Sequence, residues 1–263
     1  MKNSKSIVFR RQQALLQKLQ EKKQIDVETI ASELNVSPTT IRRDLMMFEK
    51  QNLVRRFHGG AEFIEGTLRE EDTAPTSPEA IVDDGEKRAI GQYAASLIKD
   101  GDTVFINSSS TTLRILDYLK DKQVIVITNN SSAINYPHDA SVTIILTGGE
   151  IYQRRKSLVG EFAMQTIGKI NADKCFLGVG GISAKGGITT SVLPETAINE
   201  LMMRHAKTCY VLAAKRKIGR KHNFLSCGIN HVDTLITCPG GNQVELDSLR
   251  HYGVNVIEVP ELT

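Results

Sequence analysis

The chain has 263 residues, enough for about two domains on the usual length scale of globular proteins. Apolar residues make up 40% and charged residues 24%, and no apolar run approaches the roughly 18–20 residues of a membrane-spanning helix. The composition therefore indicates a globular protein and excludes a membrane-bound one. The net charge of +3 is uneven, because residues 1–60 carry +6 and the remainder carries −3. This asymmetry predicts that the first part alone binds a polyanion, although a solvated basic surface would look the same.

The N-terminal segment "MKNSKSIVFRRQQ" is charged and contains no apolar core of a signal peptide, so we expect no secretion. The cysteines lie far apart, with no CxxC pair and no histidine at zinc-binding spacing. They are Cys175, Cys209, Cys227 and Cys238. We therefore expect neither structural disulfides nor a metal site, and a cytoplasmic protein with reduced thiols.

Three helical patterns open the chain. The first covers residues 9–21 and has an apolar stripe formed by Leu15, Leu16 and Leu19. The second follows Asp26, which is suited to cap the N-terminus of a helix. The third begins after Ser37, which caps it, with Pro38 at the first helical position.

The residue spacing of the third helix predicts which of its faces is buried. Its buried face repeats at helical spacing through Ile41, Leu45 and Phe48. At 100° per residue, the side chains pointing directly away from this face are Thr39, Arg43, Met46 and Lys50. Thr40 and Met47 lie on one flank and Arg42 on the other. The two adjacent arginines thus diverge, as a helix inserted in a DNA groove requires.

This divergence suggests different contacts for the two arginines. Arg43 and Thr39 could reach base edges, since arginine can bind guanine with two hydrogen bonds. Arg42 and the Thr40 hydroxyl are better placed for phosphates. The preceding helix and the tight turn between them are typical of a helix-turn-helix, whose second helix enters the major groove. The alternative is that either arginine pairs with Glu33, Asp44 or Glu49 on an ordinary surface helix.

Beyond this helix the pattern changes twice. The stretch "LVRRFHGGAEFI" (53–64) reads as a short two-stranded ribbon broken by Gly59-Gly60. Residues 66–86 contain prolines and many acidic residues but few large apolar ones, as in a linker or a linker that runs into a helix. From residue 87 onward, short β-branched runs alternate with helical patterns, which predicts an open and largely parallel α/β sheet.

Polar loops follow several of these strands. The strand at 103–107 is followed by hydroxyl residues 108–112 and then by a helix, whose N-terminus favours an anion. The loops at 128–130, 147–150 and 215–221 also follow strands and could converge on the same sheet edge. Taken one by one, the hydroxyl run could simply cap a helix, the glycines could form turns, and the lysines could be surface residues.

The segment 24–61, "QIDVETIASELNVSPTTIRRDLMMFEKQNLVRRFHGGA", resembles the N-terminal winged helix-turn-helix of the DeoR family of bacterial transcriptional regulators. The resemblance implies a small winged helix-turn-helix domain at 1–63, with residues 37–50 as the recognition helix. The wing would lie on the DNA backbone or in the minor groove, although His58 could equally be structural. The expected DNA-binding residues are Ser37, Thr39, Thr40, Arg42, Arg43, Lys50, Arg55, Arg56 and His58.

Residues 86–263, after a linker at 64–85, resemble the effector domain of the same family. The matching motifs are "SSSTT", "VITNN", "LTGGEIY", "SLVG", "GVGGIS", "GGITT" with Glu195, and "KIG". The resemblance implies a Rossmann-like open sheet, a fold shared with ribose-5-phosphate isomerase and glucosamine-6-phosphate deaminase, and a sugar phosphate as effector. Ser109, Ser110 and Thr111 would bind the phosphate. The rest of the pocket would be lined by Asn107, Asn129, Gly148, Gly149 and Lys217.

The chain departs from the family pattern at Asn107, Ala214 and Cys238, where many members have Asp. The loss of these carboxylates could change the effector or reflect sequence drift.

We expect a sequence-specific transcriptional regulator, most simply a repressor of a carbohydrate operon, with no cofactor, no metal and no catalytic activity. Its partners would be operator DNA, a sugar phosphate and a second copy or more of itself, as a homodimer or homotetramer. One alternative is a sugar-phosphate isomerase or deaminase with a DNA-binding appendage. It is disfavoured because Asn107 cannot act as a base, which leaves Glu195 or Glu150 for that role. Another is a DNA-coating protein without an effector.

Overall fold

The computed structural model describes residues 11–12, 14–16, 18–19, 22–50, 54–57, 59–63 and 78–262, with the backbone alone at 50 and 78–83. The chain divides into two compact units, Met1–Glu70 and Glu71–Thr263. The helix α4 (Pro78–Ser96) begins inside the segment expected as a linker, and most of that segment lies outside the described residues. The boundaries at 63/64 and 85/86 therefore stay predictions.

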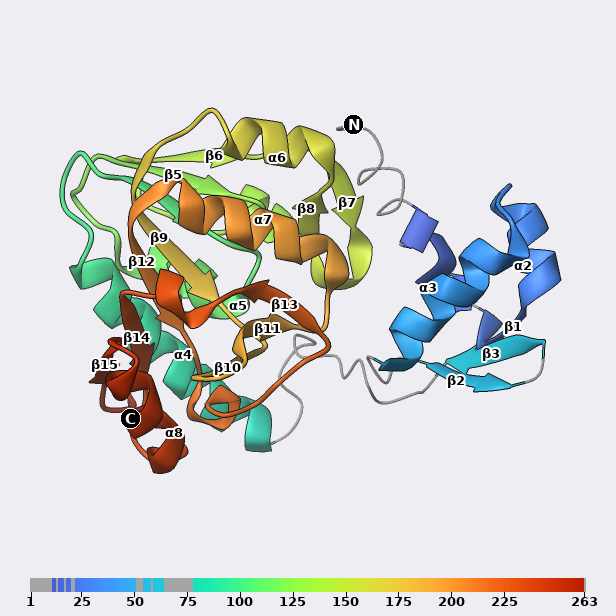
Figure 1. The fold of residues 1–263 in the computed structure, drawn as a ribbon. Helices are drawn as coiled ribbons and strands as arrows, with labels where there is room; N and C mark the ends of the chain where they lie inside the picture. Colours follow the sequence, from blue (N-terminus) through green and yellow to red (C-terminus); the bar gives the residue numbers. More distant parts are fainter. Residues whose placement is uncertain are drawn as a thin grey trace. The chain divides into compact units, whose positions relative to one another are not determined.

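The smaller unit contains the expected helices and one strand more than expected (Figure 1). The described residues between 11 and 19 are helical, and they precede α2 (Val27–Glu33) and α3 (Pro38–Lys50). The ribbon is formed by β2 (Val54–Phe57) and β3 (Gly60–Phe63), and β1 (Gln24–Asp26) pairs antiparallel with β3. The sequence did not indicate β1, because three residues with one apolar side chain carry no periodicity.

Both predicted caps in this unit are confirmed. The Asp26 side chain accepts a hydrogen bond from the Thr29 N–H at 2.9 Å, and this bond lowers the pKa of Asp26. The Ser37 hydroxyl accepts from the Thr40 N–H at 3.2 Å. The predicted apolar stripes are buried as well, and they form the core of the unit. Its largest fully buried side chains are Leu15, Leu19, Ile30, Ile41, Leu45 and Phe48.

The larger unit is built on a seven-stranded sheet in which every pairing is parallel, as the alternating pattern predicted. Across the sheet the order is β15 (Asn255–Glu258), β14 (Thr234–Thr237), β12 (Ala206–Leu212), β9 (Ala172–Gly178), β4 (Thr103–Ile106), β5 (Val124–Thr128) and β6 (Val142–Leu146). The chain thus winds outward from β4 through β5 to β6, then crosses back to β9 and winds the other way. The order reverses between β4 and β9.

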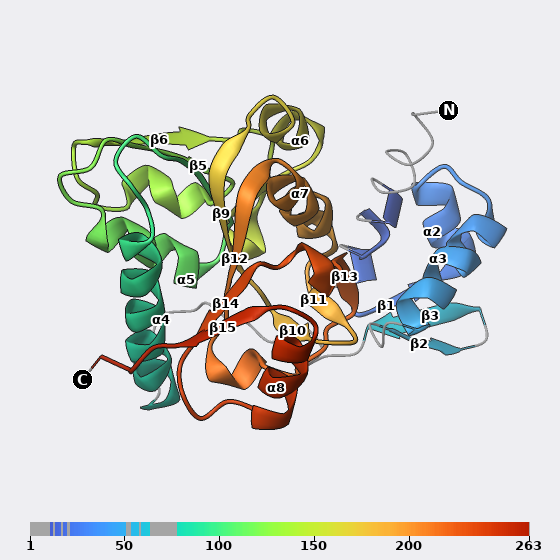
Figure 2. The same cartoon turned by 60° about the vertical axis from the view of Figure 1, so that its left-hand side comes forward.

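Helices cover both faces of this sheet (Figure 2). One face is packed by α4, by the short α5 (Ser110–Leu113) and by the 3-10 helix η1 (Arg114–Tyr118). The other is packed by α6 (Glu161–Ile167), α7 (Leu193–Arg204) and α8 (Gln243–His251). The helix expected after the hydroxyl residues 108–112 is a single α-turn that continues as a 3-10 helix.

Two smaller sheets stand apart from the main one. An antiparallel hairpin joins β7 (Glu150–Tyr152) to β8 (Ser157–Val159) through the 3-10 turn η3 (Gln153–Arg155). A second sheet has the order β10 (Gly181–Ser183), β11 (Gly187–Thr190) and β13 (Phe224–Cys227).

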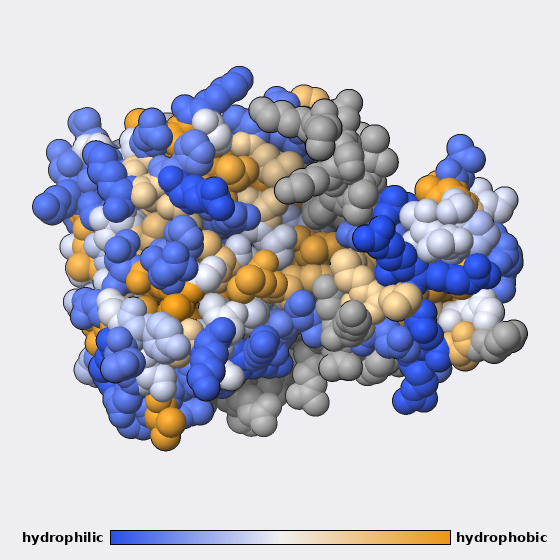
Figure 3. All heavy atoms as spheres, in the orientation of Figure 1, coloured by the Kyte–Doolittle hydropathy of each residue, from blue (hydrophilic) through white to orange (hydrophobic). Residues whose placement is uncertain are grey.

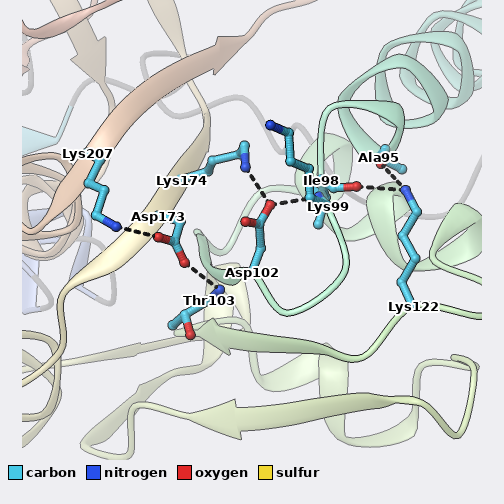
Figure 4. A network of polar contacts seen from close by, with 9 residues as sticks. All are labelled: Ala95, Ile98, Lys99, Asp102, Thr103, Lys122, Asp173, Lys174 and Lys207. Carbon is cyan, nitrogen blue, oxygen red and sulfur yellow. Dashed lines mark hydrogen bonds and ion pairs between the residues drawn. The ribbon is translucent and has the colours of Figure 1, made fainter.

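The amino ends of the central strands are tied by ion pairs (Figure 4). Asp173 of β9 accepts hydrogen bonds from the Thr103 N–H of β4 at 3.0 Å and from Lys207 Nζ of β12 at 2.7 Å. Beside it, Lys174 pairs with Asp102. Lys122 donates to the Ile98 carbonyl at 2.7 Å, close to the C-terminal end of α4. Polar contacts thus hold the amino ends of these strands in place, whereas the carboxyl ends lie at the opposite edge of the sheet.

All four cysteines are free and buried. Cys175 and Cys209 lie opposite one another on β9 and β12, and burial raises the pKa of Cys238 to about 12. Thiols in such surroundings are poor nucleophiles.

Among the described helices, none combines the length and the apolar character needed to cross a bilayer. On the face of the larger unit seen in Figure 3, apolar side chains are interspersed with hydrophilic ones.

Candidate functional site

The recognition helix presents a polar face as predicted. Ile41, Leu45 and Phe48 are at most 1% exposed, whereas Thr39, Arg42 and Arg43 are exposed. Met46 is also exposed, and Thr40 and Met47 are half-buried. The side chain of Lys50 lies outside the described residues. The surface of α3 thus offers two arginines and hydroxyl groups at its N-terminal half, where a helix in the major groove contacts bases.

Glu33, Asp44 and Glu49, the acids that the sequence offered as partners for these arginines, are engaged elsewhere. Asp44 is 3% exposed and binds Arg11, with 2.7 Å between its Oδ2 and the arginine Nε. Hydrogen bonds from Lys18 and Lys22 lower the pKa of Glu33 to about 2. Glu49 pairs with Arg56.

Arg42 and Arg43 differ in their partners. Arg42 pairs with Glu28 of α2 at 2.8 Å, and both groups are exposed. Arg43 has no ion pair or hydrogen-bonding partner for its guanidinium in the described part of the chain. The exposed ion pair between Arg42 and Glu28 contributes little to stability, so Arg42 can readily exchange it for a contact with a DNA phosphate.

The wing is a tight hairpin. Phe57 pairs with Gly60 at the closed end of the ribbon, and a Cβ at Gly60 would lie 2.3 Å from the Ile25 carbonyl oxygen. Arg55 is exposed on β2, and Arg56 uses its Nε to bind Glu49 Oε2 at 2.8 Å. His58 lies outside the described residues. The wing therefore presents Arg55 beside the partly neutralised Arg56.

A pocket lies at the carboxyl ends of β4 and β9, where the strand order reverses. Open α/β sheets place their ligands at this position. The pocket encloses about 400 Å³, part of it open to solvent. Its lining residues are Asn107, Ser108, Ser109, Arg155, Gly178, Val179, Gly180, Ile188, Thr189, Thr190, Glu195, Asn199, Lys217 and Ser226.

Asn107 clamps the two strands together at the base of the pocket. Its amide nitrogen donates to the Gly178 carbonyl at 2.8 Å and to Asn199 Oδ1 at 3.1 Å. Its oxygen accepts from the Gly178 N–H at 3.0 Å. A carboxylate could not make the two donated bonds, so the amide itself suits this position, and its buried hydrogen bonds are structural.

The hydroxyl loop that follows β4 contains serines with different hydrogen-bonding partners. Ser109 caps α5 by accepting from the Thr111 N–H at 3.2 Å. The Ser108 hydroxyl donates to Glu195 Oε1 at 2.9 Å. Glu195 lies in the first turn of α7, is 6% exposed, and is the one carboxylate among the lining residues. The sequence had marked Glu195 within a motif and as a candidate base of the enzyme alternative, but not as an effector-binding residue.

Of the eight residues expected to bind an effector, Asn107, Ser109 and Lys217 line this pocket. Ser110, Thr111, Asn129, Gly148 and Gly149 are not among its lining residues. Lys217 belongs to the basic loop after β12, and it is 8% exposed. Its neighbour Lys215 instead bridges Glu86 and Glu261, with Nζ–Oε1 distances of 3.0 and 2.6 Å.

Asn129 and Gly149 lie at the hairpin β7–β8. The Asn129 amide donates to the Leu158 carbonyl at 3.2 Å, and the Leu158 N–H donates back to the Asn129 carbonyl at 2.7 Å. Gly149 has φ +106°, and a Cβ there would lie 2.4 Å from the Val159 carbonyl oxygen. These two residues hold the hairpin against the end of β5, and the hairpin carries Arg155 to the pocket.

Several lining residues were not predicted as site residues, among them Arg155, Thr189, Thr190, Asn199 and Ser226. The loops "GVGGIS" and "GGITT" were a usable signal for part of this set, since the first follows the strand beside β4. Arg155 had no such signal in the sequence.

Comparison with known proteins agrees with this arrangement. Residues 11–67 match the model of the DeoR-like helix-turn-helix domain, and residues 83–238 match that of the DeoR C terminal sensor domain. The HTH-type transcriptional repressor GlcR of Bacillus subtilis is 32% identical over 245 residues, which are 93% of each chain. The HTH-type transcriptional regulator GlpR of Haloferax volcanii is 29% identical over 233 residues, 88% of this chain and 90% of that one.

Among solved structures, ribose 5-phosphate isomerase A of Methanocaldococcus jannaschii aligns over 49% of this chain and 52% of its own. Its TM-score is 0.35 at 15% identity, too remote to bear on function.

A helix-turn-helix unit joined to a parallel α/β unit with a pocket at its switch point defines a ligand-responsive class of DNA-binding proteins. The chain belongs to the DeoR family of transcriptional regulators, as the two matches that together span most of its length show. It is a DNA-binding transcriptional regulator and not an enzyme of the sugar-phosphate isomerase type.

Proposed function

We propose that this regulator is a repressor of a carbohydrate-metabolism operon and that a phosphorylated sugar modulates its affinity for the operator. The observation that carries the proposal is the pocket at the switch point of a sensor domain, lined by hydroxyl groups, amides and two cations. The relative GlcR is named a transcriptional repressor, which supports repression over activation.

On the DNA side, Arg43 and Thr39 read base edges in the major groove. Arg42, Thr40 and Ser37 bind phosphates on the groove wall. The remaining expected contacts, made at the end of α3 and by the wing, involve Lys50, Arg55, Arg56 and His58. Arginine suits base reading because its guanidinium can donate two parallel hydrogen bonds to guanine.

On the ligand side, Ser109 to Thr111 bind the phosphate, and Asn107 and Lys217 contact the rest of the molecule. Asn129, Gly148 and Gly149, which do not line the pocket themselves, shape its hairpin side through the backbone next to β7–β8. The ligand is the phosphorylated sugar alone, without a cofactor or metal.

The active species is a homodimer or homotetramer in the cytoplasm that binds half-sites about one helical turn apart, or a multiple of that. Effector binding shifts the orientation of subunits or domains and lowers operator affinity by its differential affinity for the two states.

A thermal-shift screen tests the ligand class. Purified full-length protein is heated with a panel of phosphorylated sugars, each beside its unphosphorylated parent. A ligand that binds the folded state alone raises the melting temperature. We expect at least one phosphorylated sugar to do so while its parent does not. A panel in which no phosphorylated sugar raises the melting temperature would refute the proposed effector class.

A further inference from the structure

The hairpin β7–β8 delivers one side chain to the pocket. Arg155 ends the 3-10 turn at the tip of the hairpin, is half-buried, and lines the pocket together with the Ser108–Ser109 loop. The hairpin lies beside α7, whose first turn carries Glu195 (Figure 1). Arg155 therefore reaches the pocket from outside the main sheet.

Hydrogen bonds hold the chain next to Arg155, so this placement is not incidental. Lys156, with φ 50°, presents its carbonyl to both the N–H and the hydroxyl of Ser131, each at 2.8 Å. The Leu158 N–H donates to the Asn129 carbonyl at 2.7 Å. These bonds fix the chain on the C-terminal side of Arg155, and the pairing of Tyr152 with Ser157 holds the strand that precedes it.

Arg155 itself makes no hydrogen bond or ion pair to any residue that the structure describes. Other arginines of the same unit are paired, as Arg114 is with Asp84 at 2.6 Å and Arg250 with Glu258 at 2.8 Å. A half-buried guanidinium that has no partner in the described structure and lines the pocket is available to a ligand bound there.

The charge of the lining gives the chemistry of that ligand. The charged residues of the lining are Arg155, Lys217 and Glu195, which together carry one net positive charge. Without Arg155, Lys217 and Glu195 cancel, and the lining has no net attraction for an anion. Arg155 therefore supplies the excess charge that favours a phosphorylated ligand over a neutral one.

We propose that Arg155 binds the phosphoryl group of the effector and is the residue by which the pocket selects phosphorylated over unphosphorylated sugars. Its planar guanidinium matches two phosphate oxygens at once, which a lysine cannot do. The proposal rests on the proposed function and adds to it the residue that sets its ligand specificity.

The test compares full-length wild type with Arg155→Ala, Arg155→Lys and Arg154→Ala. Arg154 is the matched control, because it lies in the same 3-10 turn, is exposed, and does not line the pocket. Melting temperatures are measured with inorganic phosphate, with chloride at equal ionic strength, and with each phosphorylated sugar of the panel beside its parent.

We expect wild type and Arg154→Ala to be stabilised by phosphate and by a phosphorylated sugar. Arg155→Ala should bind the same sugar roughly 10–100-fold more weakly, as is typical when a charge-assisted hydrogen bond is lost, and Arg155→Lys should fall between. Because Arg155 has no partner among the residues that the structure describes, the melting temperature of unliganded Arg155→Ala should match that of wild type, which separates lost binding from lost folding.

Wild-type affinity in Arg155→Ala, an equal loss in Arg154→Ala, or a wild type that no phosphorylated compound stabilises would each overturn the role of Arg155. If the ligand binds through Arg155 but leaves operator affinity unchanged, the proposed function fails while this inference stands.

Discussion

At the scale of single residues, the two arginines that the sequence singled out differ in what surrounds them. Arg43 is unpaired in the described structure, whereas Arg42 pairs with Glu28 at 2.8 Å. The pattern of the sequence predicted their directions from the helical period alone. It could not predict that Glu28, from the preceding helix, is the acid closest to Arg42, because that contact depends on how α2 and α3 pack.

Arg43→Ala should reduce discrimination between operator and unrelated DNA by about 1–3 kcal/mol, the usual contribution of a bidentate contact to a base. Arg42→Ala is the matched control, and it should weaken binding to all sequences alike and lower the salt dependence. Titrations of both variants against operator and scrambled duplexes at several salt concentrations separate these effects. An unchanged operator preference in Arg43→Ala would exclude base reading by this residue.

Gly178 is the residue on which the shape of the pocket depends. A Cβ there would lie 2.0 Å from Ser109 Oγ and 2.2 Å from Ser109 Cβ, so Gly178→Ala must displace the hydroxyl loop. We expect the variant to bind operator normally and to lose stabilisation by the effector. Gly168→Ala, at the end of α6 with a nearest contact of 3.3 Å, should retain both properties. Normal effector binding by Gly178→Ala would place the ligand elsewhere.

At the scale of elements, the sequence predicted the strands and helices whose residues show clear periodicity. It did not predict short elements or elements that depend on contacts between distant residues. The parallel sheet, the recognition helix and the ribbon were predicted from spacing alone. The hairpin β7–β8 was not, because it is fixed by bonds such as that from the Asn129 side-chain amide to the Leu158 carbonyl, 29 residues away. Hence Asn129 was expected in the pocket, whereas its described contacts anchor the hairpin that brings Arg155 there.

The amino ends of the strands predict a pH dependence. The hydrogen bond from Lys207 and then that from the Thr103 N–H lower the pKa of Asp173 below its ordinary value of 3.8. A lowered folded-state pKa means that Asp173 stabilises the fold fully above that ordinary value, and that this contribution is lost as pH falls below it.

Asp173→Asn should therefore lower the free energy of unfolding at pH 7 by roughly 1 kcal/mol or less, since the pair is partly exposed. The difference from wild type should shrink below about pH 4 as the wild-type carboxylate is protonated. Urea unfolding across this range measures it, and Lys207→Met with the double variant isolates the pair. A difference that stays constant with pH would show that Asp173 acts through packing instead of charge.

At the scale of the whole molecule, one chain combines a unit that presents exposed arginines with a unit that holds a cation-lined pocket at its switch point. Membership of the DeoR family establishes that the protein is a transcriptional regulator. The proposed function adds that effector binding in the larger unit changes the affinity of the smaller unit for DNA. Such coupling typically amounts to 1–3 kcal/mol, or about 5–150-fold in affinity.

The most direct measurement is the affinity of the intact protein for its operator, selected from a pool of random duplexes, with and without the phosphorylated sugar that most raises its melting temperature. We expect a saturating concentration of the sugar to weaken operator binding at least about fivefold, and its unphosphorylated parent to leave operator binding unchanged. Operator affinity that stays the same while the sugar is demonstrably bound would contradict this expectation.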